Sequence, residues 1–216
     1  MSSEAIQLMA AMDRRAVENQ IGLQCAPLLT GVKISNLLGV DRRQKAAVLF
    51  LLRSTGISCR LLCECGDRAN FFLYRKEELE AYLGKPKVSA LMRRFGYRPG
   101  LTLDAIFERV ATRYAAHMQQ KDPFPHEIGL LLGYPPEDVE GFIRYKGQHF
   151  LYSGYWKVYA NLPERLAVFD GYDQAKETIV RLMSAGWNLH QILEQNAGAL
   201  RQNQIEIGRA SCRERV

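Results

Sequence analysis

Three residues have the side-chain types that thiol chemistry needs: a cysteine, a histidine and a carboxylate. Cys25 stands two positions before Pro27, and because proline is favoured at the first helical position, the thiol is predicted just outside a helix N-terminus. The positive end of the helix dipole would stabilise a thiolate there. His126 follows Pro125 at the start of a second predicted helix, where a neutral imidazole can accept a proton. The pattern predicts Cys25 as nucleophile, His126 as base and Glu127 as the group that orients the imidazole.

Structural roles compete with this interpretation. Free cysteine is most often a small buried apolar residue, and a single histidine is most often a structural hydrogen-bonding group. Glu127 can equally cap its helix, and His149 is a second candidate base. The thiol hypothesis therefore requires that the sulfur and an imidazole meet in one exposed pocket.

A run over residues 149–160 is rich in aromatic and β-prone residues, which is typical of a strand. Trp156 and Tyr159 offer stacking surfaces, while Lys157, together with Lys33, offers positive charge to an anionic ligand. The alternative is that the rings belong to the core and the lysines point to solvent.

Cysteines at positions 59, 63 and 65 alternate with other residues, which predicts that they share one face of a strand. A metal site would need a fourth ligand, and neither a Cys-x-x-Cys pair nor a nearby histidine supplies one. His126-Glu127 also lacks the second histidine of the zinc-protease helix motif. We therefore expect a buried face and no metal site.

Helices must position most of these residues. Apolar periodicity predicts a first helix over residues 4–20, capped by Ser2 or Ser3, and a break near Gly22. Pro27 begins the next predicted helix. The local patterns thus place Cys25 between two helices.

A change of period follows. Asp41, with Gln44 three residues later, resembles a capping box for a helix that ends near Arg53, and this helix is apolar nearly all round, which predicts burial. The alternation over residues 59–65, a turn and a second run over 70–75 predict a β-hairpin.

The densest local pattern is a helical hairpin over residues 124–147. Pro125 suits the first position of its first helix, and Gly133 suits the left-handed residue that ends it. Pro136 begins the second helix and Gly147 ends it. Further helices are predicted over 76–83, 86–95, 103–118, 163–184 and 188–195, and Gly154 is predicted as a bulge in the aromatic strand.

These elements predict an α+β fold, namely a predominantly helical single domain over residues 1–206 with a small antiparallel sheet (a hairpin near 58–75 and an aromatic strand near 149–160). Residues 207–216 resemble the translation of a sequencing adapter, which indicates a metagenomic fragment with a tail outside the fold.

Charge and hydropathy exclude several classes of partner. The tail holds three arginines and one glutamate, so without it the net charge falls from +6 to +4, which is too weak for a nucleic-acid footprint. Acidic residues in the second helix of the helical hairpin would also repel DNA phosphates. The longest apolar run, 46–52, is far shorter than the ~18 residues of a membrane span. We expect a bacterial cytoplasmic protein with free thiols, no nucleic-acid partner and no membrane partner.

Three segments together resemble a known family. They are residues 25–33 with Asn36-Leu37, residues 124–143, and residues 154–159, and the match to which they belong spans most of the chain. This combination is similar to the clostridial domain-of-unknown-function family number 3793. The family has no assigned activity, so the resemblance leaves activity and cofactor open, but it marks candidate ligand-binding positions: Lys33, Asn36, Tyr134, Trp156, Lys157 and Tyr159.

Three functional hypotheses follow. The first is a cytoplasmic thiol-dependent enzyme or thiol-based small-molecule site built on Cys25, His126 and Glu127. The second is a non-catalytic binding protein linked to iron or haem handling, which uses the aromatic strand and its lysines. The third is a structural or interaction domain without chemistry.

Overall fold

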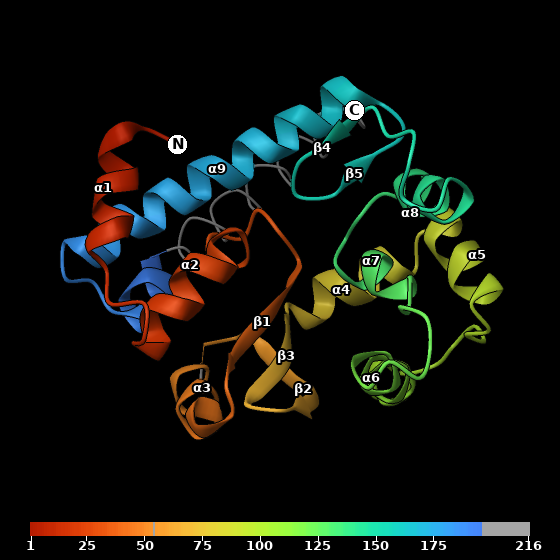
Figure 1. The fold of residues 1–216 in the computed structure, drawn as a ribbon, viewed down its shortest axis with the longest axis horizontal. Coiled ribbons are helices and arrows are strands. Elements are labelled where there is room, and N and C mark those ends of the chain that lie inside the picture. Colours follow the sequence, from red (N-terminus) through yellow and green to blue (C-terminus); the bar gives the residue numbers. More distant parts are fainter. Residues whose placement is uncertain (54, 196–216) are drawn as a thin grey trace, which may run out of the picture.

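A three-stranded antiparallel sheet lies at the centre of the molecule (Figure 1). The computed structural model describes residues 1–53 and 55–195; the adapter tail predicted at 207–216 and the end of the predicted domain 1–206 lie outside the described residues. Strand β3 (Arg68–Tyr74) pairs with both β1 (Ser35–Asp41) and β2 (Ser58–Cys65). The predicted α+β class and the hairpin near 58–75 are confirmed, whereas β1 is a strand that the sequence did not predict.

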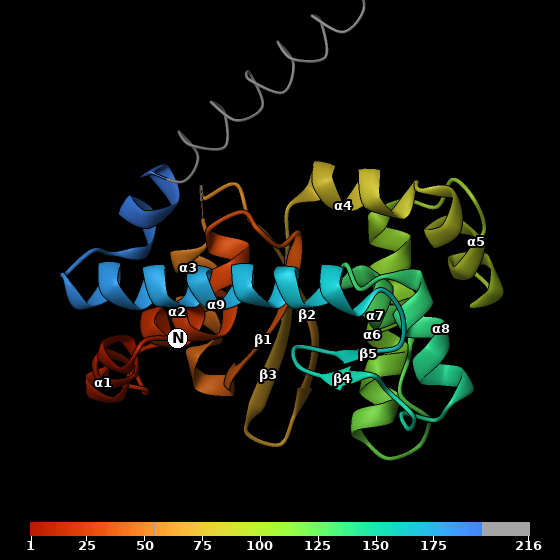
Figure 2. The same ribbon diagram turned by 90° about the horizontal axis from the view of Figure 1, so that it is seen from above.

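The sheet separates two apolar cores, because successive side chains of a strand point to opposite faces. Phe71 and Leu73 of β3 pack into one core, and Phe72 and Tyr74 pack into the other. Figure 2 shows the sheet between two groups of helices. The first core receives side chains from α2 (Val17–Leu29), α3 (Lys45–Leu51), α9 (Leu162–Ser184) and helical residues 189–195. The second receives them from α4 (Lys76–Leu83), α5 (Pro86–Arg94), α6 (Leu103–Met118), α7 (Glu127–Leu131) and α8 (Pro136–Arg144).

A β-bulge at Leu62 divides the cysteines of β2 between the two cores. Leu61 pairs with Phe71 and Cys63 pairs with Asn70, so two steps along β2 match one step along β3. Cys59 therefore packs against the first core, while Cys63 belongs to the second. The prediction that the three cysteines share one face is wrong, because the extra residue reverses the alternation.

The N-terminal helices begin and end at other residues than predicted. Ser2 caps α1 (Ser3–Ala11) as expected, through a hydrogen bond from the Ala5 amide to its hydroxyl. Gly22 does not break the chain but lies within α2, where a Cβ atom would stand 2.2 Å from the Met183 sulfur. Pro27 does not begin a helix either, since it lies in the last turn of α2.

The helix predicted to be buried after Asp41 is mostly exposed. Asp41 caps a 3₁₀ turn, η1 (Arg42–Gln44), by accepting a hydrogen bond from the Arg43 amide, and α3 follows directly. Only Val48 of α3 is buried, and Phe50 is 71% exposed. Because this short helix lies at the edge of the first core, it buries only one stripe of its surface.

The C-terminal half follows its local patterns closely. The structure confirms α4 and α6 at their predicted ends, and α9 begins one residue before the predicted start. The aromatic strand is wrong in detail, because it is a small hairpin of β4 (Tyr152–Ser153) and β5 (Lys157–Val158). Gly154 lies in its turn and donates to the Trp156 carbonyl at 3.1 Å. Among the described helices, none is long and apolar enough to cross a membrane.

Candidate aromatic pocket and lysine site

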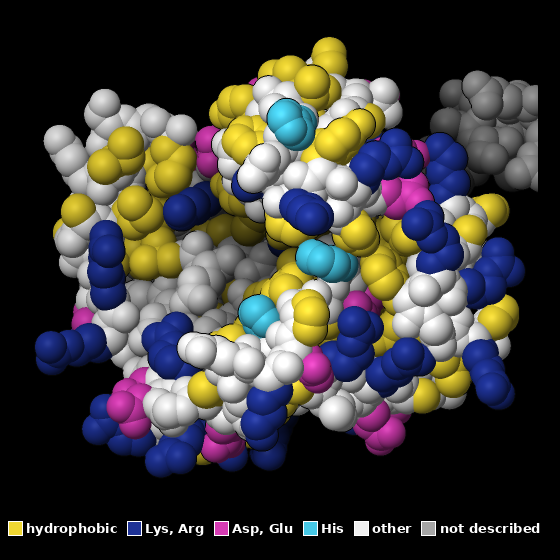
Figure 3. Space-filling model, turned by 45° about the vertical axis from the view of Figure 1, so that its right-hand side comes forward, with side chains coloured by type: hydrophobic (Ala, Val, Ile, Leu, Met, Phe, Trp, Pro, Cys, Tyr) yellow, Lys and Arg dark blue, Asp and Glu magenta, His cyan; other side chains and the backbone are white. Residues whose placement is uncertain are grey.

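A cavity of about 440 Å³ opens where α7, α8 and the β4–β5 hairpin meet. Its walls are mainly apolar and aromatic. Figure 3, which turns the α5, α6 and α8 side of the molecule toward the reader, shows histidines among hydrophobic side chains on this face. The side chains that define this aromatic pocket are Phe124, His126, Tyr134, Phe142, Trp156 and Lys157.

The tight corner between α7 and α8 places Tyr134 at the pocket. Gly133 has a φ of +78°, as its predicted helix-ending role requires, and the Tyr134 amide donates to the Gly129 carbonyl at 2.9 Å. A Cβ atom on Gly129 would stand 3.0 Å from a methyl group of Val139, so the glycine lets the two helices approach closely. The Tyr134 ring then stacks on Trp156 with their centroids 4.8 Å apart.

His126 lines the aromatic pocket with its imidazole among rings. It caps α7, which begins one residue later, and its ring centroid lies 5.6 Å from that of Phe142 and 6.0 Å from that of Phe124. Its ring forms no hydrogen bond with any residue that the structure describes. Burial lowers the pKa of His126 more than the neighbouring Glu127 charge raises it. This shift favours the neutral form of the imidazole.

Glu127 does not orient His126. Its carboxylate is fully buried and accepts hydrogen bonds from the Tyr97 hydroxyl at 2.9 Å and from Arg113, both through Oε1. Its Oε2 atom has no partner among the described residues. The carboxylate thus ties α7 to α6 and to the segment after α5.

Cys25 does not have the environment that the sequence predicted. Because Pro27 lies inside α2, the thiol stands in the helix interior rather than before an N-terminus, and it is 0% exposed. The Asn36 amide donates to its sulfur at 3.5 Å. Burial raises the pKa of Cys25 to about 12. Cys25 therefore belongs to the first core, whereas His126 lines the aromatic pocket on the helical half.

The structure brings three of the six predicted ligand-binding residues together at one amine, and a fourth, Trp156, stacks on one of them. Lys33 Nζ donates to Asn36 Oδ1 at 3.1 Å and lies 5.5 Å from the ring centroid of Tyr134, which stacks on Trp156. The ring centroid of Tyr172, which belongs to α9, lies 5.7 Å from the same Nζ atom. We call Lys33, Asn36, Tyr134 and Tyr172 the lysine site.

The remaining two predicted residues separate. Lys157 lines the aromatic pocket, where its amine donates to the Gly147 carbonyl at 2.6 Å and lies 4.8 Å from the Phe150 ring centroid. Tyr159 lies outside both groups, stacked on Tyr145 at 5.8 Å. Its contact with α8 makes it a packing residue in this structure.

Asp138 is a site residue that sequence reasoning missed. It is 2% exposed, and its carboxylate accepts hydrogen bonds from the Trp156 indole at 2.8 Å, the Tyr159 amide at 2.7 Å, the Ala160 amide at 3.1 Å and Arg165 Nε at 3.3 Å. An acid in the first turn of a helix is ordinarily explained by the helix dipole. Here it also anchors the β4–β5 hairpin and α9.

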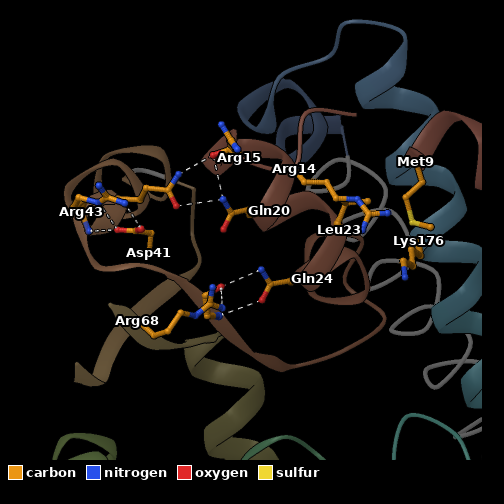
Figure 4. A pocket seen from close by; sticks show the side chains of 12 residues that line it. Met9, Arg14, Arg15, Gln20, Leu23, Gln24, Asp41, Arg43, Arg68 and Lys176 are labelled. Carbon is orange, nitrogen blue, oxygen red and sulfur yellow. Dashed lines mark hydrogen bonds and ion pairs between the residues drawn. The ribbon is translucent and has the colours of Figure 1, made fainter. Parts of the chain in front are cut away.

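A second cavity, about 970 Å³, is a basic surface between α2, β1 and α9, and the predicted site residues Cys25 and Asn36 do not line it. Figure 4 shows that Arg43 turns toward Asp41, 2.8 Å away. Arg68 donates to the Gly39 carbonyl at 2.8 Å. Because the arginines are exposed, we interpret this surface as solvated. Its cations are Arg14, Arg15, Arg43, Arg68 and Lys176.

Within residues 1–53 and 55–195, no group of three or more histidine, cysteine, aspartate or glutamate side chains is placed to hold a metal ion. The fold and its cavities define an α+β protein with an aromatic pocket on its helical half. The chain belongs to the family described as protein of unknown function (DUF3793), whose model matches residues 21–193. The resemblance inferred from the three segments is therefore confirmed. Comparison with curated proteins and with solved structures finds no match.

Proposed function

We propose that the protein binds a planar, mainly apolar small molecule with an acidic group in the aromatic pocket. The main support is a cavity of about 440 Å³ with a largely aromatic wall. This wall also contains the His126 imidazole, which forms no hydrogen bond with any described residue. Ligand pockets ordinarily measure ~300–1,000 Å³ and combine apolar walls with a few polar groups. This pocket has both properties.

Each part of the ligand has a counterpart in the wall. The stacked Tyr134 and Trp156 rings offer a flat surface to a planar ring system. The Lys157 amine donates one N–H to the Gly147 carbonyl, so its other N–H groups can donate to an acidic group of the ligand. Neutral His126 offers a nitrogen lone pair to a donor or to a metal carried by the ligand.

The haem-linked version of this proposal is favoured by His126. A porphyrin is planar and apolar with acidic groups at one edge, and neutral histidine is a common axial ligand of haem iron. We expect the Soret band of haemin to shift when haemin is titrated into the wild-type protein. The shift should persist in His190→Ala, whose histidine is exposed on residues 189–195, and should disappear in His126→Ala.

A second titration separates the outcomes. Metal-free protoporphyrin should quench tryptophan fluorescence in the wild type and in His126→Ala alike, because stacking does not need the imidazole. Quenching without a histidine-dependent Soret shift would support the planar ligand and reject iron ligation. If neither porphyrin binds and flavin mononucleotide also leaves the fluorescence unchanged, the proposal is rejected.

A thiol-dependent reaction has weaker support than binding. Cys25 is fully buried and its pKa is raised to about 12, so a thiolate would form only if α2 opened. A cytoplasmic location stays part of the proposal. Its support is that the cysteines of the described residues, at positions 25, 59, 63 and 65, are free thiols, as in a reducing compartment.

A further inference from the structure

Lys33 is a buried amine without a carboxylate partner. Lys33 is 8% exposed, and no carboxylate oxygen of a described aspartate or glutamate lies within 4.0 Å of its Nζ atom. Its polar partner is the Asn36 amide oxygen, and the Tyr134 and Tyr172 rings face it from two sides. Lysine is almost never buried unless it is paired. A buried amine that is merely structural would ordinarily have a carboxylate beside it.

Lys33 lines a cavity of about 280 Å³ that is separate from the basic surface and adjacent to the aromatic pocket. Trp156 lines both this cavity and the aromatic pocket. Arg165 lines it as well; its Nε donates to Asp138 and its Nη1 to Glu164, which leaves Nη2 without a described partner. Lys33 and Arg165 therefore line one small cavity whose walls include aromatic side chains.

We propose that Lys33 is a nucleophile that forms an imine with an aldehyde or 2-oxo acid held in this cavity, and that Arg165 binds the acidic group of that substrate. The amine nitrogen attacks the carbonyl carbon with its lone pair, and the carbonyl oxygen takes up the proton that the nitrogen loses. The carbinolamine hydroxyl takes up a proton from solvent and leaves as water while the nitrogen lone pair closes the C=N bond, and the protonated imine so formed returns one proton to solvent. The net change is condensation with loss of one water, without oxidant or reductant.

Burial makes the reactive, neutral form of Lys33 accessible near physiological pH, since it lowers the pKa to about 8. Cys25 is the facing group from α2, and Tyr134 and Tyr172 face the amine from the α7–α8 corner and from α9. Burial raises the pKa values of all three, so they stay neutral below pH 9. The pH dependence of the reaction should therefore report Lys33 alone.

The test is reductive trapping with glyoxylate and cyanoborohydride at pH 7, followed by peptide mass spectrometry. Lys85 is a matched control inside the same chain, because it is exposed yet also lies over a tyrosine ring, at 5.3 Å from the Tyr82 centroid. With a pKa near 8 instead of 10.5, the neutral fraction of Lys33 exceeds that of an ordinary lysine roughly 300-fold. Allowing for restricted access, we expect carboxymethylation at Lys33 at least ten-fold faster than at Lys85.

Two further arms test the parts of the proposal. Acetaldehyde, which lacks the acid, should label Lys33 several-fold more slowly than glyoxylate, and Arg165→Lys should reduce this preference. Lys33→Arg should abolish the label at position 33 without changing that at Lys85. The wild-type protein alone can overturn the proposal: if Lys85 is labelled while Lys33 is not, Lys33 is not the nucleophile. Equal rates of labelling with both aldehydes would show that Arg165 does not bind the acidic group of the substrate. Neither result depends on whether porphyrins bind the aromatic pocket.

Discussion

Replacing Asp138 by alanine should greatly destabilise the protein, because one buried carboxylate joins three elements. Through Oδ2 it accepts from the Trp156 indole at 2.8 Å and from Arg165 at 3.3 Å. Through Oδ1 it accepts from the amides of Tyr159 and Ala160 at 2.7 and 3.1 Å. Alanine would leave all four donors without this acceptor, inside a site that water reaches poorly.

The magnitude follows from these contacts. Removing one partner of a buried ion pair costs ~3–5 kcal/mol, because the remaining charge stays uncompensated. Each buried N–H that loses its acceptor costs ~1–3 kcal/mol, although these costs overlap when the donors belong to one group. We expect a loss of about 4 kcal/mol in the free energy of unfolding, out of the ~5–15 kcal/mol typical of a domain. Asp138→Asn keeps one oxygen and should lose about half as much.

Urea unfolding, followed by circular dichroism, measures this difference. Asp170→Ala is the control, because Asp170 is exposed on α9 and forms no hydrogen bond or ion pair with a described residue. It should change the free energy of unfolding by less than ~0.5 kcal/mol. A loss below ~1 kcal/mol in Asp138→Ala would refute the reasoning, since it would mean that the four donors find other partners at little cost.

Three other expectations follow. Gly141→Ala should lower the free energy of unfolding by ~1–3 kcal/mol, because the new Cβ would stand 2.4 Å from the Tyr159 ring. Gly171→Ala should stabilise α9 by ~0.5–1 kcal/mol, because a Cβ at this position meets nothing within 4 Å. Thermal melts of the two variants should therefore shift in opposite directions. Burial lowers the pKa of Lys33 to about 8, so above this pH the unfolded chain binds a proton that the folded chain has lost. The free energy of unfolding of the wild type should therefore rise relative to that of Lys33→Met between pH 8 and pH 10.5. If urea titrations give the same pH dependence of this free energy for both proteins, the burial of Lys33 is contradicted. Burial raises the pKa of Cys25 to about 12, so iodoacetamide at pH 8 should modify it only on unfolding, with a rate that rises with urea; rapid modification in buffer would restore the thiol-enzyme hypothesis.

Local signals in the sequence predicted the helical half well. The ends of α4 and α6 and the left-handed Gly133 follow from periodicity, capping and glycine conformation, which are properties of a few neighbouring residues. The same reasoning failed at Pro27. There the helix continues through the proline because α2 is packed between the sheet and α9, and this tertiary contact outweighs the local preference.

The candidate site was predicted only in part, for the same reason. Lys33, Asn36, Tyr134 and Trp156 meet as the ligand-binding interpretation requires. The direction of the Glu127 carboxylate depends on how α6 packs against α7, which no sequence spacing encodes. The role of Asp138 likewise depends on the β4–β5 hairpin, eighteen residues away, returning to the start of α8.

The close contact of α2 with α9 bears on how the chain acquires its structure during synthesis. Ser2 donates to Glu177 at 2.7 Å, and the Leu189 amide donates to Glu18 at 2.6 Å, so α1 and α2 are held by α9 and by helical residues 189–195. A nascent chain that has not yet released α9 from the ribosome exposes the apolar side of α2 and one face of the sheet. The elements of α4 to α8 can associate earlier, since they are neighbours in sequence. The first core should therefore be completed only when α9 and residues 189–195 have been synthesised, and until then its apolar surface is available to a chaperone.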